Sequence, residues 1–147
     1  MYDNGQHGLI AATSDQSTGI QWGGDSYARA DGVGAGSRNT TLMIAASASL
    51  VYITAARVCN EYSATSNGVT YADWYLPSLH ELRLLYDQQV VVGGFAGGTA
   101  SYWSSNESVT TASAAWRKNF SSGSEAINYK AATEYVRAIR SFYQTIN

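Results

Sequence analysis

Basic side chains gather in the last third of the sequence, which is where the chain could hold anionic groups. Residues 117–140 contain five Lys or Arg against two Glu, whereas residues 1–31 contain four Asp against one Arg. Such asymmetry indicates a polyanion partner for the basic end. It equally fits two ends of a chain that attract each other in the folded protein, so both interpretations stay open.

The residue types needed for catalysis or metal binding are not arranged in any typical pattern. His7 and His80 are isolated in the sequence and Cys59 has no CxxC partner, so a structural zinc site lacks ligands. Nothing marks a pair of carboxylates as a glycosidase pair, and no phosphate-binding or nucleophile motif occurs. We therefore predict no catalytic residue, no metal and no cofactor.

The elements that must position the basic residues are strands in the C-terminal third. Strands are predicted at 101–105, 114–120, 125–130 and 135–142, after a glycine-rich loop at 93–98. Period-two alternation places Arg117 and Lys118 on opposite faces of one strand. Arg137 and Arg140 also fall on opposite faces, so Arg140 is expected to be half-buried beside a carboxylate and Arg137 to be the better binding candidate.

The N-terminal two thirds are predicted to be mixed helix and strand. Short strands are expected at 8–12 and 19–22, a long loop at 23–37 and a turn-rich connection at 64–70. Apolar spacing predicts a helix over about 41–62, with a cap at Asn39 or Thr40 and a break near 47–49. Ser78 and Glu81 form a capping box that begins a second helix, ending near residue 89.

Composition predicts one folded, polar-surfaced domain covering residues 1–147. The apolar fraction is 45%, the charged fraction is only 14%, and 11 Tyr and four Trp offer contact area. Cys59 lies in an apolar pattern and is expected to be a buried, inert thiol. Residues 2–5 are polar and no signal peptide is evident, so an export signal is expected elsewhere in the protein. The apolar stretch at 42–56 is too short to span a membrane.

A set of short motifs, spread over nearly the whole chain, resembles a known family. The motifs are DWYLPS at 73–78, EL at 81–82, LY at 85–86, YWSS at 102–105, Trp116, Phe120, Gly123 and VRAIRSF at 136–142, with GQHGLIAA at 5–12 and GIQW at 19–22. In this order they are similar to the DUF1566 family, the module seen at the C-terminal end of the Legionella collagen-like adhesin.

The resemblance implies a fold, a location and a partner. The implied fold is α+β and C-type-lectin-like, with two or three helices packed on small twisted antiparallel sheets and long loops. The implied protein is a secreted or surface adhesin, with a collagen-like region before this domain in the full-length chain. It is expected to be a homotrimer that binds sulfated glycosaminoglycans or another anionic polysaccharide, attaching bacteria to a host and supporting biofilm aggregation. No nucleic acid and no membrane insertion are expected.

Sulfate binding requires Arg and Lys donors, with Arg favoured for bidentate contacts. The candidate ligand-binding residues are Arg117, Lys118, Lys130, Arg137 and Arg38. One chain supplies few such donors, so a trimer would have to act by avidity. The alternative is a structural or trimerising module whose loops, at 23–37 and 104–113, recognise a protein or a neutral glycan.

Overall fold

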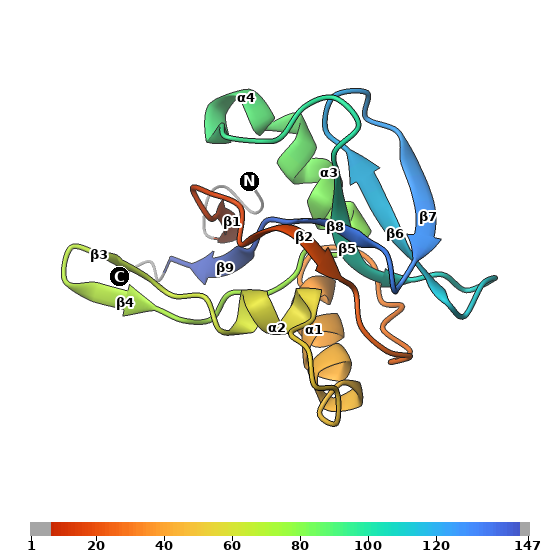
Figure 1. Cartoon of the computed structure of the whole chain (residues 1–147). Coiled ribbons are helices and arrows are strands. Elements are labelled where there is room, and N and C mark those ends of the chain that lie inside the picture. Colours follow the sequence, from red (N-terminus) through yellow and green to blue (C-terminus); the bar gives the residue numbers. More distant parts are fainter. Residues whose placement is uncertain (1–6, 145–147) are drawn as a thin grey trace.

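A computed structural model describes residues 7–144, so residues 1–6, with their polar opening and Asp3, and residues 145–147 lie outside it. The described chain is a mixed α+β structure with three sheets, as Figure 1 shows. Its helices are α1 (Ala35–Ala46), α2 (Ala55–Asn60), α3 (Leu79–Asp87) and α4 (Gln89–Val92). The sequence predicted two or three helices, and the short α4 was missed. None of the described helices is long and apolar enough to cross a membrane.

The largest sheet has five strands in the order β2-β8-β5-β6-β7. The strands are β2 (Ser17–Gln21), β5 (Ser101–Glu107), β6 (Ala114–Asn119), β7 (Glu125–Tyr129) and β8 (Thr133–Val136). All neighbours are antiparallel except β5 and β8. Tyr102 and Trp103 are both fully buried, one in each of two hydrophobic clusters. Because successive side chains of a strand point to opposite faces, β5 lies between two cores.

The first and last described strands form a separate two-stranded ribbon. β1 (His7–Ala11) pairs with β9 (Ile139–Tyr143) in antiparallel register, which we call the β1–β9 ribbon. The single strand predicted at 135–142 is therefore wrong, because the chain leaves one sheet after β8 and enters another at β9. The buried Arg137 lies at this change of sheet and bonds to neighbouring loops, which a continuous strand pattern did not reveal.

Helix α1 begins six residues before the predicted start, which shortens the expected loop at 23–37. Asn39 and Thr40, predicted as caps, lie buried inside the helix instead. Asn39 bonds both ways with the backbone of Ala30, and the Thr40 hydroxyl accepts from the Leu76 amide. These side chains face polar backbone across the core, so their type reflects tertiary partners rather than a helix end. The predicted break is real but wider, because residues 47–54 are not helical.

The capping box at the start of α3 is confirmed. Ser78 Oγ accepts from the Glu81 amide at 3.2 Å, and the Ser78 amide donates to Glu81 Oε1 at 3.0 Å. Glu81 is fully buried and does more than cap its own helix, since it also accepts from the Gly34 and Gly36 amides and the Tyr75 hydroxyl. One carboxylate therefore joins the beginnings of α1 and α3.

Gly36→Ala is expected to lower the free energy of unfolding by about 2–3 kcal/mol, as overpacking in cores commonly does. A Cβ at residue 36 would lie 2.5 Å from Glu81 Oε1 and 2.6 Å from the Leu76 carbonyl oxygen. Urea denaturation followed by circular dichroism measures the change. Gly24→Ala is the control, because a Cβ there meets nothing within 4 Å. Equal losses for the two variants would contradict this close approach.

A β-hairpin replaces the predicted turn-rich connection at 64–70. Strands β3 (Ala64–Ser66) and β4 (Val69–Tyr71) pair across Asn67 and Gly68, which both have positive φ, 51° and 77°. Asn-Gly between two short strands favours this type of turn. The hairpin projects beside β9 in Figure 1, and the two lie on either side of a groove.

Candidate functional site

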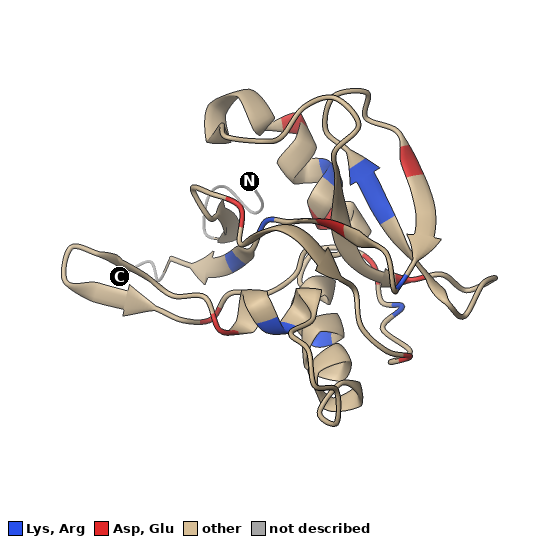
Figure 2. Cartoon of the chain, in the orientation of Figure 1, with Lys and Arg blue, Asp and Glu red and all other residues tan. Residues whose placement is uncertain are grey.

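The five predicted basic residues do not form one surface. The side chains of Lys118, Lys130 and Arg137 are only 7%, 6% and 0% exposed, and that of Arg117 is 32% exposed. Each of these four forms an ion pair. Arg38 is exposed on α1, with no ion pair among the described residues. Figure 2 shows acidic residues interleaved with the basic ones throughout the molecule.

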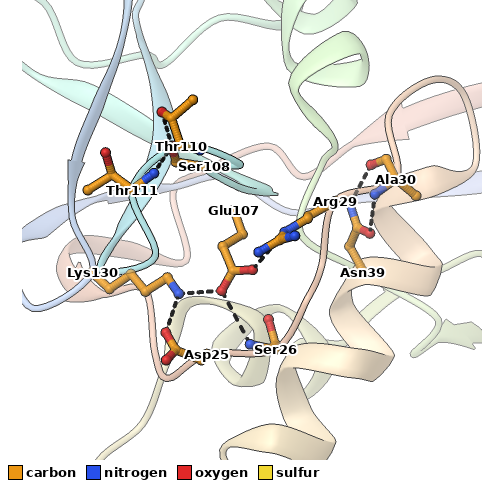
Figure 3. Close-up of polar contacts among 10 residues, drawn as sticks. All are labelled: Asp25, Ser26, Arg29, Ala30, Asn39, Glu107, Ser108, Thr110, Thr111 and Lys130. Carbon is orange, nitrogen blue, oxygen red and sulfur yellow. Dashed lines mark hydrogen bonds and ion pairs between the residues drawn. The ribbon is translucent and has the colours of Figure 1, made fainter.

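Lys130 lies inside a cluster of four charged residues, drawn in Figure 3. Its ammonium donates to Glu107 Oε1 and to Asp25 Oδ1, the latter at 2.7 Å. Arg29 approaches the other oxygen of Glu107 from the opposite side, with Nε at 3.2 Å. The lysine also lies over the Trp22 ring, 5.1 Å from its centroid. With these partners, Lys130 fixes the loop before α1 to β5 and offers little to a ligand.

Arg117 is half-buried on the outer sheet and shares an acidic partner. Its Nη1 lies 2.5 Å from Glu134 Oε1, and Asn128 Nδ2 donates to the same oxygen at 2.8 Å. Glu134 lies on β8 and therefore joins two neighbouring strands, Arg117 on β6 and Asn128 on β7. The guanidinium keeps further donors that no described residue uses, so Arg117 retains some capacity to contact an anion.

Arg137 is more deeply buried than Arg140, although the sequence predicted Arg137 to be the better placed of the two for binding. Arg137 is 1% exposed and donates to Asp15, to the carbonyls of Ala12 and Gly93, and to that of Gly94. Its position leaves it no free donor directed to solvent. Arg140 is half-buried and paired with a carboxylate, as predicted, with two hydrogen bonds of 2.6 and 3.0 Å to Asp73.

A second cluster, which was not predicted from the sequence, joins α3 to the β6–β7 hairpin. Arg83 makes a bidentate pair with Glu125, at 2.8 Å from Nε and 2.7 Å from Nη2. Lys118 Nζ reaches the same carboxylate at 3.1 Å and the Gly123 carbonyl at 2.8 Å. We call Arg83, Lys118 and Glu125 the Arg83 cluster. No spacing in the sequence signals it, because residue 83 and residue 125 meet only in the folded chain.

The Arg83 cluster carries one positive charge more than its acid neutralises. Hydrogen bonds from Arg83, and then from Lys118, hold the pKa of Glu125 below its usual range. The same pair raises the pKa of Arg83. By formal charge the cluster holds two cations and one carboxylate, and the Asp31 carboxylate also acts on Arg83 and raises its pKa. The Arg83 side chain is 46% exposed and that of Lys118 only 7%, so Arg83 is the cation through which the cluster meets solvent.

Other reactive groups in the described residues are isolated. No three His, Cys, Asp or Glu side chains among them are grouped so as to hold a metal ion. Cys59 is buried, as predicted, and burial raises the pKa of its thiol. Burial likewise raises the pKa of Tyr102 to about 12. These shifts describe interior side chains and give no sign of a nucleophile or general base.

Comparison with family models gives one match, the Lcl C-terminal domain, over residues 11–140. The chain belongs to this family. The match confirms the resemblance seen in the sequence motifs, and it makes the chain an adhesin-associated domain. No curated protein matches the chain. The part that matches the Lcl C-terminal domain contains all four helices, the five-stranded sheet and both charged clusters.

Proposed function

We propose that this Lcl C-terminal domain binds sulfated glycosaminoglycans or another anionic polysaccharide at the bacterial surface. In that role it attaches cells to a host and supports aggregation in biofilms. The observation that carries the proposal is the Arg83 cluster, where two cations share one carboxylate and the arginine is exposed. Family membership supports the adhesin setting.

Arginine is the better of the two basic residues for a sulfate ester, because its planar fork makes paired hydrogen bonds. In the Arg83 cluster, Glu125 occupies Nε and Nη2 and so leaves Nη1 for a ligand. Arg38, exposed and without an ion pair among the described residues, is the second contact that we propose. Lys118 shares the Glu125 carboxylate with Arg83 and is itself buried, and Arg117 contributes only its unused donors.

We include in the proposal that the protein is a secreted or surface homotrimer. A single chain has a net charge of −2 and few exposed donors, so one copy alone would bind a polyanion weakly. Three copies present each basic site three times to one repeating polymer, so weak contacts add through effective concentration. Helices packed on small, mostly antiparallel sheets with long loops support a C-type-lectin-like arrangement, which we include in the proposal.

The double variant Arg83→Ala and Arg38→Ala is expected to elute from immobilised heparin at clearly lower salt than the unmodified chain. Exposed charges attract a polyanion through a field that salt screens over about 10 Å at 0.1 M. Elution is measured over a sodium chloride gradient. Two results would contradict the proposed polyanion site. One is retention that does not depend on the salt concentration, and the other is elution of the double variant at the same salt as the unmodified chain.

Arg57→Ala is the matched control for this experiment. Arg57 is as exposed as Arg83, at 44% of its side chain, but has its own carboxylate, Glu61, at 3.1 Å. Its removal takes away one charge and leaves the proposed site intact, so only a small shift is expected. Light scattering tests the assembly separately, since a mass near one chain would contradict the trimer.

A further inference from the structure

The groove beside the β3–β4 hairpin differs in chemistry from both charged clusters. Its volume is about 880 Å³, and its walls are the hairpin with the following segment on one side and the β1–β9 ribbon on the other. We call it the hairpin groove. A site of several hundred cubic ångströms lined by aromatic rings and a few polar groups is typical of small-ligand binding.

Aromatic side chains form much of its lining, and the structure holds them in place. Trp74 donates its indole N–H to the Tyr71 carbonyl at 2.9 Å. Tyr62 packs edge-on against Trp74, with ring centroids 4.9 Å apart. Tyr62 and Tyr71 are half-buried, whereas Tyr143 is 76% exposed at the other side of the groove. Tyr62 and Trp74 are therefore already ordered, so they lose little side-chain freedom when a ligand binds.

One ion pair supplies the strong polar groups of the groove. Among the described residues that line the groove, Asp73 and Arg140 are the only charged ones, and they make the two hydrogen bonds of 2.6 and 3.0 Å. Arg140 also lies over the Tyr71 ring, 4.3 Å from the centroid. The Asp73 side chain is 60% exposed and its oxygens keep further acceptor capacity, while Arg140 Nη1 remains a donor.

We propose that the hairpin groove binds a neutral oligosaccharide. A sugar ring has an apolar C–H face that packs on tyrosine, and hydroxyl groups that donate to Asp73 while accepting from Arg140. The lining has no net charge, so nothing in it favours sulfate, in contrast to the Arg83 cluster. This site is independent of the polyanion site of the proposed function and shares no residue with it.

The test is a titration of the isotope-labelled chain with cellohexaose, chitohexaose and maltohexaose, followed by amide NMR spectra. At least one of these neutral sugars is expected to shift groove residues saturably, with a dissociation constant of about 1 mM or tighter. Saturable shifts confined to other surfaces, or no shifts with all three sugars at about ten times that concentration, would overturn the proposal.

Two groove variants and one control separate stacking from general damage. Tyr71→Ala and Asp73→Asn are each expected to weaken binding about tenfold, equivalent to about 1.4 kcal/mol. Tyr129→Ala is the control, because Tyr129 is 68% exposed on β7 and does not line the groove. Asp73→Asn keeps the side-chain shape, so it still gives an answer if the tyrosine variant fails to fold. Unchanged affinity in Asp73→Asn would overturn the assigned polar contact.

Heparin distinguishes the two sites from each other. Tyr71→Ala is expected to elute from heparin at the same salt as the unmodified chain, while Arg83→Ala with Arg38→Ala keeps its affinity for the neutral sugar. Failure of heparin binding alone contradicts the proposed function and leaves the groove proposal standing. Heparin that shifts groove residues, while the neutral sugars do not, would show that the groove takes an anionic ligand and would overturn the proposal.

Discussion

Glu81→Ala is expected to lower the free energy of unfolding by about 4 kcal/mol, which is large beside the whole stability of a domain. Glu81 is fully buried, and its two oxygens accept four hydrogen bonds from the Gly34, Gly36 and Ser78 amides and the Tyr75 hydroxyl. Alanine removes this shared acceptor, and the Gly36 and Ser78 amides that lose it are buried. The cost of such unsatisfied groups exceeds the lost hydrogen bonds themselves.

Two further variants make this expectation sharp, each measured by urea denaturation. Glu81→Gln keeps the volume but replaces one oxygen by a donor that faces other donors, so it is expected to cost about 2 kcal/mol. Glu61→Ala is the control, because that side chain is 53% exposed and its pair with Arg57 is worth less than about 1 kcal/mol. If Glu81→Ala lowers the free energy of unfolding no more than the control does, the proposed role of Glu81 is wrong.

Arg137→Ala is expected to destabilise the domain by about 3–5 kcal/mol, the usual cost of breaking a buried ion pair. The guanidinium pairs with Asp15 at 2.8 Å and donates to three carbonyls, two of them in the glycine-rich loop after α4. It also lies over the Phe95 ring, 4.1 Å from the centroid. Without it, Asp15 loses its cationic partner and the loop loses the hydrogen bonds to the Gly93 and Gly94 carbonyls.

Thermal melting with Arg137→Lys and Arg57→Ala beside it tests the geometry of this contact. Lysine keeps the charge but has one nitrogen and cannot reach all four acceptors, so it is expected to rescue only part of the loss. Arg57→Ala removes an exposed arginine and is expected to shift the midpoint little. Full rescue by lysine would show that charge alone, and not the planar fork, matters at residue 137.

Local signals in the sequence were sufficient where the partners lie a few residues apart. The capping box of α3 is confirmed because Ser78 and Glu81 are three residues apart and satisfy each other. Strands β5, β6 and β7 were found from alternation and from the turn between the last two. The β3–β4 hairpin was missed even though Asn67 and Gly68 are a strong turn signal, because the flanking strands have only three residues each.

The burial of the basic residues could not be predicted, because their partners are distant in sequence. Lys130 meets Asp25 across 105 residues, and Arg137 meets Asp15 across 122. Two of the five basic residues at 117–140 therefore pair with acids of residues 1–31, which supports the second of the two interpretations for Lys130 and Arg137. Arg83 escaped notice for the same reason, since only the fold brings Lys118 and Glu125 beside it.

The β1–β9 ribbon determines how the described domain responds to a pulling force. His7 is paired with Tyr143, so the two ends of the described chain leave the ribbon at the same place. A force that draws these ends apart acts across the strands and loads one pair of backbone hydrogen bonds at a time. The ribbon therefore unzips from residues 7 and 143 toward residues 11 and 139, at a lower force than strands sheared along their length would bear.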